Sequence, residues 1–200
     1  MVAGMSGIDP TAEIVSPKRD QLMAAAWRLF YRDGYRAVGI DTLLAEAVVA
    51  KMTLYNHFES KEALIVAVLE KRSDDLLSAI RASVTAAGRS PVRQLDAIFD
   101  GLHEWFRSNE FKGCAFIRAL SEYPEPDHPI HQAAWRHKLR FKALLAGVAE
   151  NAGLKHPAGF AETVGMLVDG AIVASHATSK AEPANTARVA ALSLLKAAGA

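Results

Sequence analysis

The sequence predicts an all-α fold, and three observations lead to this prediction. Apolar residues recur three and four positions apart along successive segments, the spacing that places them on one face of a helix. No segment alternates apolar and polar residues as a half-buried strand does. Proline, glycine and serine separate the apolar segments at positions where helices start or stop. Together these features favour helices packed around a shared core.

The first helix is expected to begin at Ser16 and Pro17, an N-cap followed by proline at the first helical position. Gly34 is expected to end it. Its apolar face consists of Leu22, Ala25, Ala26, Leu29 and Phe30. Residues 1–16 contain no continuous apolar segment, so we expect a flexible tail and neither a signal peptide nor a membrane anchor.

Residues 39–61 predict two short helices joined by a tight turn, which is a helix-turn-helix pattern. Asp41 stands where a carboxylate favours a helix N-terminus. In the second helix Leu54 and Phe58 share one face, so the polar and aromatic residues between them project outward. We expect Ala45 to lie where the two helices cross closely and Val49 to fill the angle between them.

The rest of the chain predicts longer helices. Ser60 is expected to cap one that extends to about Ala87, and later helices are expected over about 91–106, 114–122, 130–152, 158–179 and 184–198. The prediction is an N-terminal three-helix helix-turn-helix bundle followed by a larger C-terminal helical domain. The expected boundaries are 1–16 for the tail, 17–62 for the helix-turn-helix domain and 63–200 for the second domain.

Composition limits the function. The 200 residues carry a formal net charge of +1, and half of them are apolar, as in a soluble globular protein. A single cysteine, Cys114, excludes an internal disulfide framework and favours the cytoplasm. The apolar run from Val164 to Ser175 contains Asp169 and is too short to span a membrane. Near-neutral charge by itself argues mildly against nucleic-acid binding, which usually shows as a basic excess.

The helix-turn-helix segment carries a more specific signal. The run Thr53-Leu54-Tyr55-Asn56-His57-Phe58, followed by Ser60-Lys61-Glu62-Ala63-Leu64, resembles the signature of the TetR family of transcriptional regulators. The order of helices resembles that family along nearly the whole chain, although only the first third carries specific motifs. Val48 stands where the family usually has glycine in the turn, and Ala50 where it usually has a Ser or Thr cap. Either the turn bends differently here, or neighbouring contacts absorb the strain of a β-branched residue at positive φ.

The resemblance implies which residues contact DNA. Lys51, Met52, Thr53 and Asn56 occupy positions that enter a major groove, where lysine donates to guanine and asparagine pairs with adenine. Phosphate contacts are expected from Thr42, Tyr55, His57 and Lys61. The simpler alternative is that Tyr55 and His57 only pack against the first helix.

Aromatic and polar residues of the second domain are candidates for an apolar ligand pocket between helices. They are Phe99, His103, Trp105, Phe106, Phe116, Trp135, Met166 and His176, with Arg118, Tyr123, His137 and Phe141 as further members. The alternative is that the aromatic residues form an ordinary core.

The resemblance implies that residues 17–62 form a DNA-binding domain and residues 63–200 a ligand-binding and dimerisation domain. It also implies the partners. These are double-stranded operator DNA with a palindromic sequence, an unidentified small-molecule effector and a second copy of the chain, bound through the last two helices. A repressor released by an apolar ligand is the function that we expect, with an activator left open. An ordinary intramolecular helix pair is the alternative to the dimer interface.

Other kinds of site find little support. Asp127, His128 and His131 flank a proline and a helix start, so we expect caps and loop residues and no metal site. Cys114 opens a helix, where a redox sensor or an inert buried thiol is conceivable.

No nucleophile elbow or phosphate loop occurs, so we expect neither an enzyme nor a cofactor. The alternatives are a small-molecule-binding protein without DNA function and an all-α enzyme that uses His103, Glu104 or His137.

Overall fold

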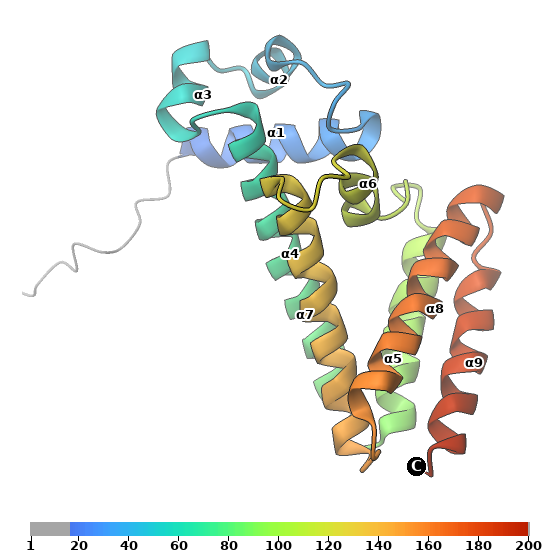
Figure 1. Ribbon diagram of the computed structural model, residues 1–200. Coiled ribbons are helices and arrows are strands. Elements are labelled where there is room, and N and C mark those ends of the chain that lie inside the picture. The colour runs from blue at the N-terminus through green and yellow to red at the C-terminus, as the bar shows by residue number, and fades with distance from the viewer. Residues whose placement is uncertain (1–16, 200) are drawn as a thin grey trace, which may run out of the picture.

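The computed structural model describes residues 17–199, and this part of the chain is all-α, as predicted. It forms nine helices: α1 (Pro17–Asp33), α2 (Ile40–Ala47), α3 (Lys51–His57), α4 (Lys61–Ala86), α5 (Pro91–Arg107), α6 (Ala115–Glu122), α7 (Pro129–Asn151), α8 (Pro157–Thr178) and α9 (Glu182–Ala197). Figure 1 shows α1, α2 and α3 gathered at one end, with the longer helices extending away from them. The predicted tail and the Ser16 cap lie outside the described residues.

The N-terminal helices pack through the apolar face that the sequence predicted. Leu22, Leu29 and Phe30 of α1 are buried together with Leu43 of α2 and Leu54 of α3. Gly34 ends α1 at a φ of 95°, and its N–H donates to the Phe30 carbonyl. The expected helix-turn-helix is therefore present and rests on α1.

The turn between α2 and α3 contains Val48 where the TetR resemblance leads one to expect glycine. Val48 adopts a left-handed conformation with φ 51° and ψ 48°, so the turn keeps the geometry in which glycine is favoured. The Val48 side chain is 82% exposed, so packing does not compensate for the strain. Ala50 occupies the N-cap of α3 and offers no side-chain acceptor. The conformation thus retains an unrelieved backbone cost.

One expectation about this turn is wrong. Ala45 is exposed and does not mark a close helix crossing. The small buried residue of α2 is Ala47, because it lies four positions after the buried Leu43 and so shares its face. Val49 is partly buried against the N-terminal core, as expected.

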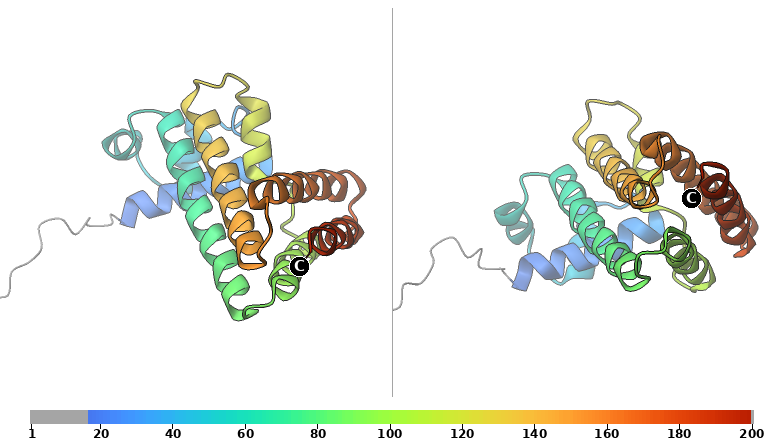
Figure 2. Two further views of the ribbon diagram at one scale, coloured as in Figure 1. Left: turned by 60° about the horizontal axis from the view of Figure 1, so that its bottom comes forward. Right: turned by 90° about the horizontal axis from the view of Figure 1, so that it is seen from below.

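Helix α4 connects the two cores of the molecule. The Ser60 hydroxyl caps it by accepting from the Ala63 N–H at 3.1 Å. Its first half contributes Leu64, Ile65, Val68 and Leu69 to the N-terminal core, and its second half contributes Leu77 to the core of α5, α7, α8 and α9. Views from the other end show α4, α5, α7 and α8 side by side, with α9 on the outside (Figure 2).

Helix α6 is attached firmly to the N-terminal helices. Glu122 at its end accepts from the backbone N–H groups of Tyr35 (3.2 Å) and Arg36 (2.7 Å). At its start the Tyr35 hydroxyl donates to the Ala115 carbonyl at 3.0 Å. Arg118 donates to the Tyr31 carbonyl at 2.9 Å. A motion of α6 would therefore be transmitted directly to the end of α1 and the segment after it.

Helix α8 is the most apolar of the described helices. It is long and apolar enough to cross a membrane by length and composition alone, and 44% of its most apolar stretch is buried inside the molecule. It packs against α7 and α9. A core helix of a soluble protein passes the same test, so this is weak support for a membrane span.

Candidate nucleic-acid interface and internal cavity

The outer face of α3 is exposed to solvent, and its inner face is buried. Leu54 is fully buried and Phe58 is 6% exposed, so these two residues fix the helix to the N-terminal core. Met52 is 69% exposed and Tyr55 is 41% exposed. Of the other predicted contact residues in α3, Lys51 and Asn56 are exposed, and Thr53 and His57 are partly buried. The helix thus presents a mixed polar and apolar face to solvent.

The two predicted phosphate contacts outside α3 differ in their surroundings. Thr42 is exposed in the first turn of α2. Lys61, at the start of α4, is partly buried, and its amine donates to the Arg36 carbonyl at 3.4 Å. Burial lowers the pKa of Lys61. Lys61 therefore contacts the segment before α2.

Several basic side chains near this surface are already engaged within the protein. Arg28 pairs with Glu46 at 3.0 Å, and the guanidinium of Arg19 lies 5.3 Å from the Phe58 ring centroid. Lys51 takes part in no ion pair among residues 17–199. It is therefore the cation of α3 that is available to a ligand.

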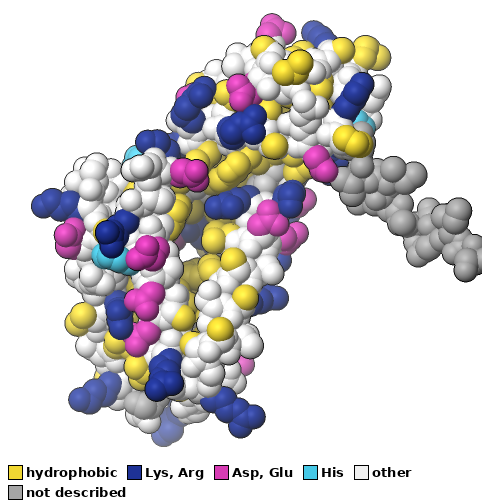
Figure 3. Space-filling model, turned by 180° about the vertical axis from the view of Figure 1, so that it is seen from behind, with side chains coloured by type: hydrophobic (Ala, Val, Ile, Leu, Met, Phe, Trp, Pro, Cys, Tyr) yellow, Lys and Arg dark blue, Asp and Glu magenta, His cyan; other side chains and the backbone are white. Residues whose placement is uncertain are grey.

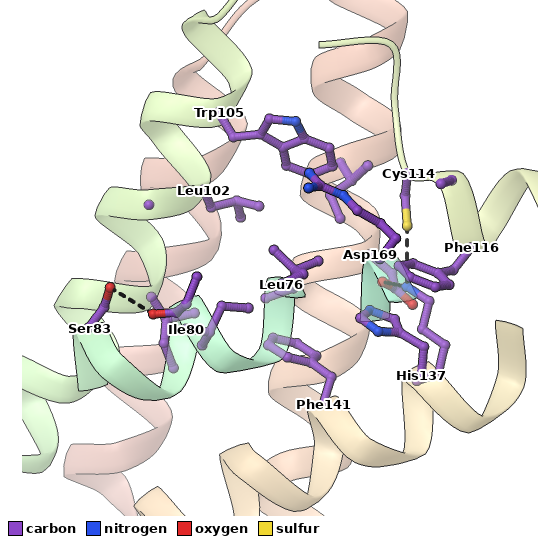
Figure 4. Close-up of a pocket in the computed structure, with 18 of the residues that line it drawn as sticks. Leu76, Ile80, Ser83, Leu102, Trp105, Cys114, Phe116, His137, Phe141 and Asp169 are labelled. Atoms are coloured by element: carbon purple, nitrogen blue, oxygen red, sulfur yellow. Dashed lines mark hydrogen bonds and ion pairs between the residues drawn. The ribbon is translucent and has the colours of Figure 1, made fainter. Parts of the chain in front are cut away.

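A cavity of about 340 Å³ lies below the N-terminal helices. Helices α1, α4, α5, α7 and α8 and the start of α6 contribute to its wall, which is mostly apolar (Figure 4). The lining residues are Trp27, Tyr31, Arg72, Leu76, Ala79, Ile80, Ser83, Ala97, Ile98, Gly101, Leu102, Trp105, Cys114, Ala115, Phe116, His137, Lys138, Phe141, Val168, Asp169 and Ile172. Its volume is within the range of small-molecule sites.

An ion pair between a buried lysine and a partly exposed aspartate lies in one part of the wall. The Lys138 amine, on a side chain that is only 8% exposed, contacts an Asp169 carboxylate oxygen at 2.5 Å. The same amine lies 3.9 Å from the Cys114 sulfur and donates toward it. Cys114 is partly buried and faces the cavity, so it is neither fully exposed nor a sealed core thiol.

His137 lies beside this pair and is neutral. Its ring stacks on Phe116, with centroids 3.5 Å apart and planes 8° apart. Burial, with the neighbouring charges of Lys138, Arg140 and Arg72, lowers the pKa of His137 to about 3. Its Nδ1 is 2.9 Å from the Ser73 hydroxyl. The oxygen of this hydroxyl accepts a hydrogen bond from Arg140 at 3.2 Å. The hydroxyl proton is therefore directed to Nδ1, which acts as an acceptor.

Only part of the predicted pocket set lines this cavity. Trp105 and Phe116 do, as do His137 and Phe141 among the further members. Phe99 and Phe106 are buried in the core next to it. Helical periodicity identifies a buried face, but it does not separate the residues that face a cavity from those that face a neighbouring helix.

The remaining predicted pocket residues lie elsewhere. His103 is partly buried, and its Nδ1 has no hydrogen-bond partner in the part of the chain that the structure describes. Trp135 and Met166 are 45% and 59% exposed, and the Trp135 ring centroid is 5.2 Å from the Lys142 amine. His176 is exposed at the outer side of Gly113 and Phe111. Arg118 and Tyr123 contact the N-terminal helices instead.

Three charged residues of the wall were missed by the sequence analysis as pocket residues: Arg72, Lys138 and Asp169. Asp169 interrupts an apolar helix, and Lys138 falls on the buried face of α7 four residues after Ala134. A charge on an apolar helical face is the signal that would have indicated them, because a buried charge needs a partner or a ligand.

The histidines near α7 have structural partners. His128 occupies the N-cap of α7, as expected, and its Nδ1 accepts from the Ile130 N–H at 3.2 Å. The Nδ1 of His131 is 2.8 Å from the Tyr123 carbonyl oxygen. Among residues 17–199 no group of three His, Cys, Asp or Glu side chains has the arrangement of a metal site.

Comparison with known proteins now identifies the family. Residues 22–68, which span α1 to the first turns of α4, match the family described as bacterial regulatory proteins, tetR family. The crystal structure of SCO4454, a TetR-family transcriptional regulator from Streptomyces coelicolor, is 33% identical, with a TM-score of 0.82. That match covers 92% of this chain and 96% of that one. The chain belongs to the TetR family of transcriptional regulators.

Curated relatives agree with this assignment to the TetR family. The transcriptional activator FasR of Mycolicibacterium smegmatis is 40% identical over 86 residues, which are 42% of this chain and 39% of FasR. The transcriptional repressor DhaR of a Mycobacterium species is 35% identical over 89 residues, which are 44% of this chain and 45% of DhaR. The match thus spans less than half the length of these two relatives, one of which is named an activator and the other a repressor.

Membership of the TetR family indicates what the exposed face of α3 and the cavity are for. TetR-family regulators bind operator DNA and act as dimers with small-molecule effectors, and they are not enzymes. The matched segment contains the exposed face of α3, while most of the cavity wall lies outside it. The surface and the cavity are therefore the places to seek the DNA and effector contacts.

Proposed function

We propose that this TetR-family protein is a homodimeric repressor that binds a palindromic operator through α3 and is released by a small, largely apolar ligand in the cavity. The observation that carries the proposal is the construction of α3, with Leu54 and Phe58 buried and its other side exposed. A short helix anchored in this way is suited to enter a major groove. The cytoplasm, where operator DNA is accessible, is the compartment that we propose.

The proposed contact residues divide into those that face bases and those that face phosphates. Lys51 and Asn56 are suited to guanine and adenine edges, and Met52 and Thr53 complete the surface that faces the bases. Phosphate contacts fix the register and are proposed for Thr42, Tyr55, His57 and Lys61. The Lys61 amine already donates to the Arg36 carbonyl, so a phosphate there would also contact the ordered segment before α2.

The proposed domains are residues 17–62 for DNA binding and 63–200 for the ligand and the dimer. The presence of two apolar cores supports this division. Phe116, Ala119 and Ile130, however, join the N-terminal core although they lie beyond residue 62. Helices α6 and α7 thus connect the second domain to the DNA-binding helices, in addition to α4.

The dimer is proposed to form through α8 and α9. Met166 and Val173 on α8 and Val189 and Leu194 on α9 are apolar and between 37% and 65% exposed. A groove between the two helices is lined by small residues such as Gly170, Ala174 and Ala190. Small residues let helices of a second copy approach closely, and a twofold axis would bury the same surface on both copies.

In the proposed mechanism, the ligand favours a dimer whose recognition helices are wrongly spaced. Two half-sites on one face of DNA are about 34 Å apart, so a modest rotation of α4 in each copy removes simultaneous binding. Helix α4 lines the cavity and also carries residues of the N-terminal core, which suits it to transmit this rotation.

The test is binding of the purified protein to the DNA upstream of its own gene at several salt concentrations, measured by fluorescence anisotropy. Binding should weaken with salt, because Lys51 and the phosphate contacts displace counterions. Lys51→Ala and Asn56→Ala should each weaken binding about tenfold, the cost of one lost base contact. Lys155→Ala, exposed and distant in the sequence from the proposed surface, is the control and should bind as the wild type does.

Absence of binding at every salt concentration would contradict the proposal and favour a small-molecule-binding protein without DNA function. Promoter expression in cells distinguishes a repressor from an activator. Deletion of the gene should raise expression from the bound promoter, and a fall would identify an activator.

A further inference from the structure

Arg72 has free hydrogen-bonding capacity inside the cavity. Its guanidinium lies over the Trp27 ring, 4.8 Å from the centroid, and Trp27 in turn stacks on Tyr31 with centroids 4.8 Å apart. A guanidinium carries five N–H donors, and its attraction to a ring face does not replace the hydrogen bonds that these donors can make. Within residues 17–199 Arg72 takes part in no side-chain hydrogen bond or ion pair. These donors are therefore unused within the described residues.

The charges of the cavity wall do not balance. Three charged side chains line it: Arg72, Lys138 and Asp169. Lys138 and Asp169 neutralise each other at 2.5 Å. His137 adds no charge at neutral pH, because its pKa is about 3. One positive charge, that of Arg72, remains without a counter-ion in a largely apolar cavity.

We infer that the cavity binds a monoanionic ligand with an apolar body, whose carboxylate or similar group accepts from the in-plane N–H donors of Arg72. This inference rests on the proposed function and adds the chemical class of its ligand. Leu76, Ile98, Leu102 and Phe141 line the cavity and provide apolar contact for the body. An anion in this place forms a charge-assisted, bidentate contact, which a neutral molecule of the same shape cannot form.

The cavity opens to solvent between α4 and α5. The lining residues that are exposed there are Ala79, Ser83 and Gly101, which are small. Figure 3 shows the molecule hollowed in this region, with hydrophobic side chains on the walls and both basic and acidic side chains at the upper edge. A Cβ added at Gly101 would meet no atom within 4 Å. A large side chain at this position would therefore obstruct the opening without disturbing the helix.

The position of Arg72 also connects the ligand to the DNA-binding helices. Arg72 belongs to α4, and Trp27 belongs to α1. An anion that draws the guanidinium toward the cavity changes the contact between these two helices. The charged group of the ligand is thus placed where its binding affects the N-terminal bundle.

Two fluorescent probes that differ by one charge test the inference. One is 8-anilino-1-naphthalenesulfonate, and the other is its neutral analogue N-phenyl-1-naphthylamine. The wild type should bind the sulfonate about tenfold more tightly, the difference made by one charge-assisted contact. Arg72→Met keeps an apolar side chain beside Trp27 and should remove this preference. Arg72→Lys should retain part of it.

Two control variants test whether the preference for the anionic probe comes from Arg72 and whether the probes bind in the cavity. Arg81→Met removes an exposed arginine of the same helix that does not line the cavity, and it should preserve the preference. Gly101→Phe should weaken both probes, because it obstructs the opening. Circular dichroism and thermal unfolding of every variant verify that the fold is intact.

The outcomes separate this inference from the proposed function. If Gly101→Phe weakens both probes but Arg72→Met leaves their ratio unchanged, the cavity binds ligands and the inferred charge preference is wrong. Equal affinity of the wild type for both probes overturns the inference as well. If neither probe binds, or if Gly101→Phe leaves both unchanged, the ligand cavity itself is overturned.

Discussion

At the residue scale, the polar groups beside the cavity are arranged so that each has a defined charge. His137 is held between the Phe116 ring and the Ser73 hydroxyl, in surroundings that already contain Lys138, Arg140 and Arg72. Protonation would place a further positive charge in this buried group and remove the acceptor that Ser73 needs. The neutral imidazole is therefore part of the folded structure.

This arrangement predicts a specific dependence of stability on pH. The pKa of His137 is about 3 in the folded protein and near 6.5 in the unfolded chain, so the unfolded state binds a proton first as the pH falls. The stabilisation is fully present above pH 6.5 and is lost progressively as the pH falls toward 3. Between pH 7 and pH 5 the free energy of unfolding should fall by about 2 kcal/mol through this residue.

The measurement is urea unfolding of the wild type and of His137→Gln at both pH values. Glutamine keeps an acceptor for Ser73 but does not titrate, so the variant should lack this part of the pH dependence. His156→Gln, an exposed position, is the control and should behave as the wild type does. An equal pH dependence in His137→Gln would contradict the prediction.

At the element scale, the turn between α2 and α3 forms in spite of its residues. Val48 is left-handed and Ala50 cannot cap α3, yet Leu43, Ala47, Leu54 and Phe58 bury both helices against α1. Burial of such side chains stabilises by about 1.5–3 kcal/mol each for the larger ones. Tertiary packing thus exceeds the local cost, and the turn keeps its shape.

Replacement of Val48 by glycine should therefore stabilise the protein. The left-handed conformation costs an L-residue about 1–2 kcal/mol, and the greater entropy of glycine in the unfolded chain returns part of this gain. We expect a net increase of about 0.5–1 kcal/mol in the free energy of unfolding, measured by urea denaturation.

A control in the same helix-turn-helix distinguishes strain relief from a general effect of glycine. Ala45→Gly lies within α2 and is exposed, so it should cost about 0.5–1 kcal/mol. If Val48→Gly destabilised the protein as much as Ala45→Gly does, the strain at Val48 would be absent.

At the scale of the whole molecule, the exposed apolar residues of α8 and α9 determine the predicted assembly. Val189 is 65% exposed on α9, and Val189→Asp would place a charge in the proposed interface of both copies. We expect dissociation to monomers at micromolar concentration and loss of operator binding, because a single recognition helix makes half the contacts. Analytical ultracentrifugation measures the first result.

Leu139→Asp is the matched control for this prediction. Leu139 is an exposed leucine of α7, 48% accessible and outside the proposed interface, so the variant should remain dimeric. A wild type that is monomeric at all concentrations, or a Val189→Asp variant that stays dimeric, would contradict the proposed interface.

The sequence by itself determined the helices and the family resemblance. The start of α4 follows from the N-cap Ser60, and the end of α1 follows from Gly34, both of which act locally. The outward face of α3 also follows from helical spacing. These features depend on neighbours within a few positions, which a sequence displays directly.

Only the tertiary structure decided what lies between the helices. It placed Trp105 and Phe116 on a cavity wall but Phe106 in a core and Trp135 on the surface, although all four are aromatic and helical. It paired Lys138 with Asp169, which are 31 positions apart, and left Arg72 without a counter-ion. Helical periodicity tells which side of a helix is buried, whereas a cavity or an ion pair depends on which other helix that side meets.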